Sequence, residues 1–301
     1  MPHPPGRSRR AGRRLPPEAL ARLVAELADD RYRADRTTQA LLPRARRGTA
    51  VLRAEAPGVL SGVTAAAHVA RAAGLAATPL RRDGDRLRSG TAVLRLTGDV
   101  RTILGVERTV LNVLMHLAGV ATATDRAVRS VRSAGGTAAI FATRKTLPGL
   151  KDLEKAAVVH GGGHPHRRDL ADGFLAKSRH LELVPLPEAV RRLRRAAGRS
   201  GRVQVEVRSA AEALEAVRAG ADALLIDNAG PAGSRRIVAA LERAGVRDRV
   251  WVELSGGIDP AGAGRYARCG ADALSLGAIT HSAPALPFHL RWTASHGPRP
   301  A

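Results

Sequence analysis

The chain contains few of the residues on which several common classes of protein depend. Cys269 is the only cysteine among 301 residues, which excludes an internal disulfide framework and a zinc site built from four cysteines. Aromatic residues make up only 2% of the sequence, so the core must be built from Ala, Val, Leu and Ile. No uninterrupted apolar run reaches the length of about 18 residues that a membrane-spanning helix needs, and the Arg/Pro-rich N-terminus lacks the apolar stretch of a secretory signal. We therefore expect a cytoplasmic protein with no membrane partner.

Acidic residues are scarce relative to basic ones, and the formal net charge is +22. Five arginines and no acid fall within residues 1–17, which we expect to form a disordered tail. The remaining excess is spread along the chain, and the aromatic residues on which single-stranded nucleic acids stack are nearly absent. A non-enzymatic nucleic-acid-binding protein is therefore an alternative that rests on charge alone. Small polyanionic substrates are the favoured partners.

Lysine is also rare, since only Lys145, Lys151, Lys155 and Lys177 stand among 49 basic residues. All of the lysines thus lie within residues 145–177. A bias toward arginine explains the scarcity of lysine but not this clustering. A lysine ammonium is a compact charge with a tunable pKa, which a guanidinium cannot replace. The clustering predicts that residues 145–177 contribute to a functional site.

The first part of the chain has the pattern of a small α+β domain. Residues 18–29 carry apolar residues at helical spacing, and the Ala-rich stretch 61–74 also favours a helix. Short strands are predicted near 49–55 and 91–97. A long helical pattern follows over 107–132, with a predicted break at Gly119.

Beyond residue 135, short apolar runs alternate with longer amphipathic segments, which is typical of parallel βα units. The predicted strands are 137–142, 172–176, 203–207, 222–226, 250–254 and 272–276, and the predicted helices are 187–198, 209–219, 233–244 and 260–269. The run Gly-Ala-Asp-Ala-Leu begins at residue 220 and again at residue 270, a separation that fits two βα units. Six such units favour a closed (β/α) barrel over an open sheet.

In such barrels the functional groups lie at the carboxyl ends of the strands. The predicted ends carry basic residues (Arg144, Lys145 and Lys177, with His166 and Arg167 beside the glycines at 161–163), carboxylates (Glu206, Asp227 and Glu253) and small turn residues (Ser255, Gly256, Gly257 and Gly277). Guanidinium groups bind carboxylates through paired hydrogen bonds. Paired carboxylates suit Mg²⁺ together with phosphate oxygens, and glycine turns let backbone N–H groups approach a phosphate.

Each of these groups also has a simpler explanation. A single cation is more often a solvated surface charge, and Glu206 and Asp227 could form ion pairs with arginines. A Ser-Gly-Gly turn is common without any ligand. A zinc site built from His164, His166 and His180 is not favoured, because their spacing matches no strong zinc pattern.

Several stretches together resemble the quinolinate phosphoribosyltransferase family, also called carboxylating nicotinate-nucleotide pyrophosphorylases. In the order of the family they are Glu107-Arg-Thr-Val-Leu-Asn, Thr143-Arg-Lys-Thr-Leu-Pro-Gly-Leu, Gly161-Gly-Gly-His-Pro-His-Arg, Val205-Glu-Val, Leu225-Ile-Asp-Asn, Glu253-Leu-Ser-Gly-Gly-Ile and Gly277-Ala-Ile-Thr-His-Ser. The resemblance runs from about Asp35 to about Pro284. It implies the α/β fold of a type II phosphoribosyltransferase, with an N-terminal α/β sandwich domain (18–116 with 287–301) and an incomplete, TIM-like (β/α) barrel (117–286). It also implies a homodimer or larger oligomer.

The same resemblance implies a reaction and its residues. The enzyme would be a pentosyltransferase of NAD biosynthesis that uses Mg²⁺ and transfers the phosphoribosyl group of phosphoribosyl pyrophosphate to quinolinate. The products would be nicotinate mononucleotide, pyrophosphate and CO₂. The acid would be held by Arg144, Lys145, His166, Arg167 and Lys177, with Arg108 of the partner subunit completing the site. Glu206 and Asp227 would hold Mg²⁺ and the ribose, and Ser255, Gly256 and Gly277 would hold the 5-phosphate. Thr143, Gly257 and His281 complete the expected substrate-binding set, within which Lys145, Glu206 and Asp227 are the expected catalytic residues.

The sequence departs from the family at several positions of the expected site. Ser178 and Arg179 stand where the family has Asp-Asn after its lysine, and Pro165 replaces an Asn. Ala142 and Arg208 stand where the family has aspartates. Pro165 and the missing aspartate resemble the ModD-like proteins of molybdate-transport clusters. A paralogue of the same fold that acts on a different aromatic acid is therefore a second hypothesis.

Overall fold

The computed structural model describes residues 15–293, and the chain divides into two compact units. The first, which we call the sandwich unit, comprises 15–123, 147–161 and 283–293 of these residues. The second, the barrel unit, comprises 124–146 and 162–282. Most of the predicted tail 1–17 lies outside the described residues, and the first helix begins at Pro17.

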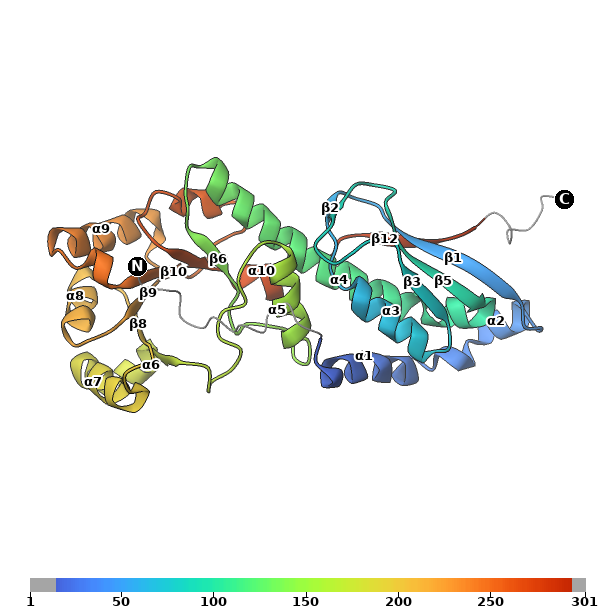
Figure 1. Ribbon diagram of the computed structural model, residues 1–301, viewed down its shortest axis with the longest axis horizontal. Helices are drawn as coiled ribbons and strands as arrows, with labels where there is room; N and C mark the ends of the chain where they lie inside the picture. The colour runs from blue at the N-terminus through green and yellow to red at the C-terminus, as the bar shows by residue number, and fades with distance from the viewer. Residues whose placement is uncertain (1–14, 294–301) are drawn as a thin grey trace. The chain divides into compact units, whose positions relative to one another are not determined.

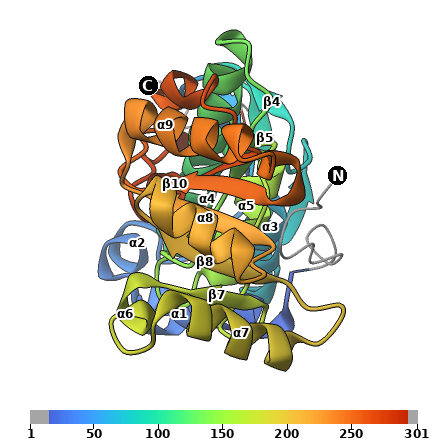
Figure 2. The same cartoon turned by 90° about the vertical axis from the view of Figure 1, so that its left-hand side faces the viewer.

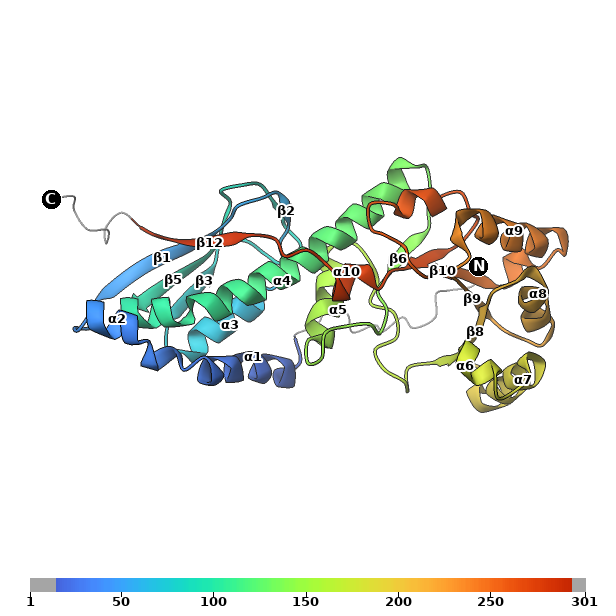
Figure 3. The ribbon, with the colours of Figure 1, turned by 180° about the vertical axis from the view of Figure 1, so that it is seen from behind.

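The sandwich unit is built on a four-stranded antiparallel sheet with the order β12-β1-β5-β3. Its strands are β1 (Arg47–Ala54), β3 (Ala76–Pro79), β5 (Ala92–Asp99) and β12 (Phe288–Trp292), and β2 (Gly58–Val59) pairs with β4 (Arg86–Leu87) beside them. Figure 3 shows β12 lying beside β1, so the end of the described chain returns to the sheet of its first part. The predicted strands near 49–55 and 91–97 are confirmed.

The sandwich unit also contains helical segments before, between and after these strands. They are α1 (Pro17–Asp29), η1 (Tyr32–Ala34), α2 (Arg36–Leu41), α3 (Val63–Ala72), the first part of α4 (Val100–Ser133) and α5 (Lys151–His160). Helix α3 packs on β3 and β5, and α1 packs on α3 (Figure 1). The buried side of α3 is mostly alanine, and small side chains let a helix approach a sheet closely where aromatic residues are scarce. The predicted helices at 18–29 and 61–74 are confirmed.

The predicted break at Gly119 is wrong, because α4 runs unbroken from Val100 to Ser133. A Cβ on Gly119 would collide with the carbonyl oxygen of Pro284 and stand 3.1 Å from Ala285 Cα. The glycine therefore serves a close approach of the chain at 284–286 and does not end the helix, although glycine costs about 1 kcal/mol in a helix interior. Among the described residues α4 is the one helix long and apolar enough to cross a membrane, but 61% of its apolar window is buried, as in a core helix.

The barrel unit contains a six-stranded sheet with the order β6-β11-β10-β9-β8-β7, and every neighbouring pair in it is parallel. The strands are β6 (Ala139–Phe141), β7 (Phe174–Ala176), β8 (Val203–Val207), β9 (Ala223–Asp227), β10 (Trp251–Ser255) and β11 (Ala273–Ser275). The helices are the end of α4, α6 (Ser178–Leu181), α7 (Leu186–Ala197), α8 (Ala210–Arg218), α9 (Gly230–Arg243) and α10 (Ala278–His281), with 3-10 turns η2 (Arg247–Arg249) and η3 (Ala263–Tyr266). Figure 2 shows α7, α8 and α9 side by side over the outer face of the sheet.

Two predictions for this unit are wrong. The sheet is not closed, because within the described residues β6 and β7 form its two edges and do not pair. The incomplete barrel that the family resemblance implies is thus the observed architecture. The helix predicted at 260–269 is reduced to η3, since the glycine-rich sequence there folds against the end of α4. Ser130 donates to the Ala261 carbonyl at 2.7 Å and accepts from Gly264 N at 2.9 Å.

The register of the parallel strands decides which side chains face the inside of the sheet. Glu206 pairs with Leu225, and Leu225 pairs with Glu253. Side chains alternate along a strand, so Asp227 and Ser255, two residues further on, face the same side. An apolar cluster of Phe141, Ala223, Trp251 and Ala273 lies on that side, and three of its members are the first residues of β9, β10 and β11. The side chains of Glu206, Asp227 and Ser255 therefore lie next to this apolar cluster, toward the carboxyl ends of the strands.

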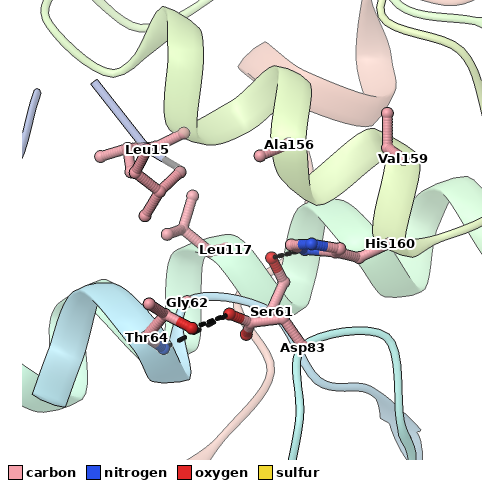
Figure 4. Close-up of a pocket in the computed structure, with 10 residues that line it drawn as sticks. Leu15, Ser61, Gly62, Thr64, Asp83, Leu117, Ala156, Val159 and His160 are labelled. Carbon is pink, nitrogen blue, oxygen red and sulfur yellow. Dashed lines mark hydrogen bonds between the residues drawn. The ribbon is translucent and has the colours of Figure 1, made fainter. Parts of the chain in front are cut away.

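A small cavity of about 200 Å³ lies inside the sandwich unit (Figure 4). Ser61 is buried in its wall, with its hydroxyl oxygen 2.9 Å from His160 Nδ1. Asp83 accepts hydrogen bonds from Val63 N at 2.9 Å and from Thr64 Oγ1 at 2.8 Å, at the start of α3. Burial lowers the pKa of His160 below its ordinary value of 6.5, and the charge of Asp83 opposes this only in part. The folded protein thus favours the neutral imidazole.

This burial predicts a stability that falls on the acid side. A histidine whose pKa is lower in the folded than in the unfolded protein binds fewer protons when folded, so the free energy of unfolding decreases as the pH falls below about 6.5. We expect His160→Gln, whose amide can still bond to Ser61, to weaken that decrease. Urea unfolding between about pH 5 and pH 7.5 measures it. His68→Gln, on the exposed side of α3, is the control. Equal pH dependence in the His160 variant and the wild type would contradict the expectation.

Candidate active site

The loop after β6 carries the first two predicted cations, Arg144 and Lys145. Its backbone is held at two points: Thr143 Oγ1 accepts from Lys145 N at 2.9 Å, and Thr280 Oγ1 donates to the Lys145 carbonyl at 2.7 Å. Thr280 lies on α10, which follows β11, the strand next to β6. The fold thus fixes the backbone of Lys145 from two neighbouring βα loops.

Gly277 makes room for two of the other predicted residues. A Cβ at this position would stand 3.0 Å from Lys145 Cδ and 2.8 Å from His281 Nε2. The structure therefore brings Lys145, Gly277 and His281 together at the ends of β6 and β11. The His281 ring is held from its other side, where Nδ1 lies 2.6 Å from Ser282 Oγ.

His166 lies in the loop that follows α5, and its ring is buried. Nε2 is 3.2 Å and 3.3 Å from the two carboxylate oxygens of Glu253, while Nδ1 accepts from Arg167 N at 2.7 Å. His164, two residues earlier, pairs with Phe141 as an isolated bridge, and their rings stack with centroids 4.8 Å apart. The loop is thereby attached to the open edge of the sheet at β6.

Glu253 is predicted from the sequence to lie at a strand end, but the sequence assigned it no role in this site. Its carboxylate also accepts from Gln204 Nε2 at 2.9 Å. Burial alone would raise the pKa of Glu253, but its interaction with the adjacent His166 ring and the hydrogen bonds from Ser275 and Gln204 outweigh it and hold the pKa below its ordinary value. The group is therefore a buried carboxylate anion.

Arg167 and Arg144 concentrate positive charge near one another. Burial lowers the pKa of the Arg167 guanidinium, and repulsion from Arg144 lowers it further, while Glu253 and Asp172 act in the opposite direction. Two guanidinium groups close enough to repel each other favour an anion placed between them. Within the described residues, Arg144 makes no ion pair that would neutralise it.

The two predicted carboxylates, Glu206 on β8 and Asp227 at the end of β9, face the same side of the sheet. Glu206 accepts from Ser178 N at 3.3 Å, and Asp227 accepts from Asn228 Nδ2 at 2.5 Å. Across residues 15–293 neither forms an ion pair, so the alternative of an arginine partner finds no support there.

A resident metal has too few ligands in this part of the protein. No group of three or more His, Cys, Asp or Glu side chains that could hold a metal ion occurs among the described residues. Two carboxylates fit Mg²⁺ when a substrate and water supply the remaining oxygen ligands. Glu206 and Asp227 therefore suit a metal ion that arrives with a phosphorylated substrate.

The turn after β10 is built from Ser255, Gly256 and Gly257. Both glycines have positive φ, 94° and 59°, and a Cβ on Gly256 would stand 2.6 Å from Asn228 N. Asn228, itself at φ 54°, donates its N–H to the Ser255 carbonyl at 2.9 Å. Only glycine fits this crossing of two backbones, and the turn leaves main-chain groups accessible beside Asp227.

The structure also shows how the residues around the start of α6, where the sequence differs from the family pattern, are arranged. Lys177 is exposed, and its N–H donates to His180 Nδ1 at 2.9 Å. Arg179 forms an ion pair with Glu182 at 2.8 Å, and its side chain is 86% exposed. The extra charge of Arg179 is thus neutralised toward solvent and does not join the buried cations.

Arg108 belongs to the sandwich unit, on an exposed part of α4. It lines a cavity of about 720 Å³ together with Asn112 and His116 of α4 and with Glu26 and Asp29 of α1. The smaller cavity beside His160 has no arginine or lysine among its lining residues. Of these two cavities only the larger one carries a cation that an acidic ligand could use.

Known proteins match both parts of the chain. Sequence models described as the N-terminal and C-terminal domains of quinolinate phosphoribosyl transferase match residues 35–118 and 120–291. A protein of Methanothermobacter thermautotrophicus named probable nicotinate-nucleotide pyrophosphorylase [carboxylating] is 42% identical over 250 residues, which cover 83% of this chain and 90% of that protein. The human nicotinate-nucleotide pyrophosphorylase [carboxylating] is 34% identical, over 92% of this chain and 93% of its own.

Solved structures agree with the sequence matches. The crystal structure of NadC from Streptococcus pyogenes superimposes with a TM-score of 0.83 at 33% identity, covering 94% of this chain and 100% of that one. The nicotinate-nucleotide pyrophosphorylase of Francisella tularensis gives a TM-score of 0.82 at 31% identity, covering 93% and 98%. The chain belongs to the quinolinate phosphoribosyl transferase family.

Proposed function

We propose that this protein transfers the phosphoribosyl group of phosphoribosyl pyrophosphate to quinolinate and releases pyrophosphate and CO₂, leaving nicotinate mononucleotide. One observation carries the proposal. At one side of the sheet end, Arg144 and Arg167 repel each other. At the other side lie Glu206 and Asp227, and among the described residues neither these carboxylates nor Arg144 form an ion pair. Such a site suits an acidic acceptor next to a metal-bound polyanion.

The cations would bind and orient the acid. Quinolinate carries two adjacent carboxylates on a pyridine ring, and Arg144 and Arg167 can each offer paired N–H donors to one of them. Lys145, fixed by Thr143 and Thr280, adds a compact charge at the end of β6. His166, Lys177 and Thr143 would complete the contacts with the acid.

The carboxylates would serve the phosphoribosyl donor. When bound, Mg²⁺ would neutralise the pyrophosphate that leaves C1 of the ribose. As that bond breaks, positive charge develops on the ribose ring, and the negative groups of Glu206 and Asp227 stabilise it. Their hydrogen bonds with Ser178 and Asn228 hold them in place before the substrate arrives. Positioning of the two reactants supplies much of the remaining rate.

The glycine turns would hold the 5-phosphate. Ser255, Gly256, Gly257 and Gly277 expose backbone in two successive βα loops, and His281 lies against Gly277. Loss of CO₂ from the 2-position would then follow: the electron pair of the broken C–C bond stays on that ring carbon, where the adjacent cationic ring nitrogen stabilises it. A proton from water then binds to the same carbon and completes nicotinate mononucleotide.

We further propose a cytoplasmic homodimer in which Arg108 completes the site of the partner subunit. The exposure of Arg108 beside a cavity of the sandwich unit supports this, since a guanidinium at such a place can reach another chain. A second candidate function, transfer to a different aromatic acid, is favoured by Ser178 and Pro165, which differ from the family near the acceptor and the ribose.

A product assay tests the proposed function directly. Purified protein with Mg²⁺ and phosphoribosyl pyrophosphate is expected to form nicotinate mononucleotide from quinolinate, but not from nicotinate, at about 0.1 s⁻¹ or faster. Mass spectrometry detects the nucleotide. Absence of any nucleotide from either acid would contradict the proposal, and product from another pyridine or benzene carboxylate would identify the second candidate function.

Replacement of Lys145 by alanine tests the acid-binding side. We expect Lys145→Ala to raise the Kd for quinolinate by about tenfold or more, because a charge-assisted hydrogen bond is worth about 1.5–3 kcal/mol. The unfolding midpoint should stay near the wild-type value, since the side chain fills no core space. Calorimetric titration measures the Kd, with Lys151→Ala on α5 as the control lysine. An unchanged Kd in the Lys145 variant would remove this residue from the acid-binding set.

A further inference from the structure

Glu253 is a carboxylate placed where water does not reach it. Its side chain is 2% exposed, and it faces the inside of the sheet on the same strand as Trp251, a member of the apolar cluster. An ionised group in such surroundings is costly unless donors replace the lost water. The hydrogen-bond partners of Glu253 therefore decide whether the interior of this sheet is stable.

The donors to Glu253 come from three parts of the barrel unit. Gln204 on β8 donates at 2.9 Å, Ser275 on β11 donates as well, and the His166 ring lies within 3.3 Å of both oxygens. Gln204 and Ser275 are already held by two strands of the same sheet, β8 and β11, of which β11 pairs with β10. His166 is the one partner that belongs to a loop, so this contact fixes a loop to the sheet.

The hydrogen bonds of the His166 ring determine which nitrogen carries the proton. Nδ1 accepts from Arg167 N at 2.7 Å, so its lone pair is used and it holds no hydrogen. Nε2 therefore carries the proton and donates it to Glu253. With both nitrogens engaged the ring cannot turn, and it holds its own backbone at a φ of 54°, a region that residues other than glycine rarely adopt.

Arg167 is the next residue and depends on that backbone. Its guanidinium is half-buried and is repelled by Arg144, so without a fixed main chain it would move toward solvent. Glu253 opposes this movement in two ways: it anchors the residue before Arg167, and its negative charge attracts the guanidinium. Phe141, whose ring lies edge-on to His166 with centroids 5.9 Å apart, closes the remaining side.

We propose that Glu253 is a positioning residue for acid binding: by holding the Nε2–H tautomer of His166, it fixes the backbone from which Arg167 reaches the acceptor acid. This inference rests on the proposed function for the identity of the acid. Glu253 itself touches no substrate in this account and acts only through His166 and Arg167.

The test compares two substitutions around the same carboxylate. Glu253→Gln keeps the volume but removes the charge and one acceptor, while the control Ser275→Ala removes another donor to Glu253 without touching His166. Long-range ¹⁵N–¹H spectra of histidine-labelled protein report which ring nitrogen of His166 carries the proton. Titration with pyridine-2,3-dicarboxylate gives the Kd of the acid, and steady-state kinetics gives the KM of each substrate.

We expect Glu253→Gln to alter the His166 nitrogen shifts and to raise the Kd and KM for the acid by about tenfold. The KM for phosphoribosyl pyrophosphate and the kcat at saturating acid should change by less than about twofold. Ser275→Ala should leave the His166 shifts and the Kd near wild type. Unaltered His166 shifts, or an acid Kd equal in the two variants, would overturn the proposal.

A second variant guards against misfolding of the first. Glu253→Asp keeps the charge but shortens the side chain and so draws the carboxylate away from His166, so it too should raise the Kd for the acid. An acid Kd at the wild-type value in this variant would overturn the proposal. A wild-type protein that binds the acid but forms no nucleotide would contradict the proposed function instead, while the Kd comparison would still decide the role of Glu253.

Discussion

Backbone hydrogen bonds between β8, β9 and β10 set the register on which the candidate site depends. Glu206, Leu225 and Glu253 stand side by side, and alternation along each strand then turns Asp227 and Ser255 to the same inner side. A slip of one residue in any pair would exchange these polar groups for the buried Val207, Ile226 and Leu254. The helices on the outer face hold the register, because they bury those aliphatic side chains. Packing of the helices on the outer face of the sheet thus determines which polar side chains face the inner side.

Opposite charges are kept apart within this framework. Arg144 and Lys145 follow β6, and Arg167 lies in the loop attached to the same edge, whereas Glu206 and Asp227 stand on β8 and β9. Because β10 and β11 separate β6 from β9 in the sheet, these three cations and the two carboxylates need not neutralise each other, whereas Lys177, which follows β7, lies exposed on the side of the carboxylates. Glu253, a carboxylate that lies near the cations, is buried and bonded to His166. An acidic acceptor and a metal-bound donor can then occupy neighbouring positions with opposite charge requirements.

Much of the fold follows from the local sequence. The apolar runs located the six parallel strands, and the residues just after them carry most of the candidate site. The open sheet could not be inferred from counting βα units, since closure depends on whether β6 and β7 meet, which is a long-range property. Gly119 was misread as a helix break because its cause, the passage of Pro284 and Ala285, lies 165 residues away in the chain. The contact between His166 and Glu253 was missed for the same reason. The local sequence around His166 does not predict a contact with Glu253, because the two residues are brought together only by the fold.

The separation of the two charged sides can be tested in a single crystal structure. Crystals are prepared with Mn²⁺ in place of Mg²⁺, a non-hydrolysable analogue of phosphoribosyl pyrophosphate, and pyridine-2,3-dicarboxylate, and anomalous scattering locates the manganese. The account predicts manganese within direct ligand distance of Glu206 or Asp227, and the acid carboxylates on Arg144 and Arg167. Manganese bound elsewhere, or an acid that contacts neither arginine, would contradict it.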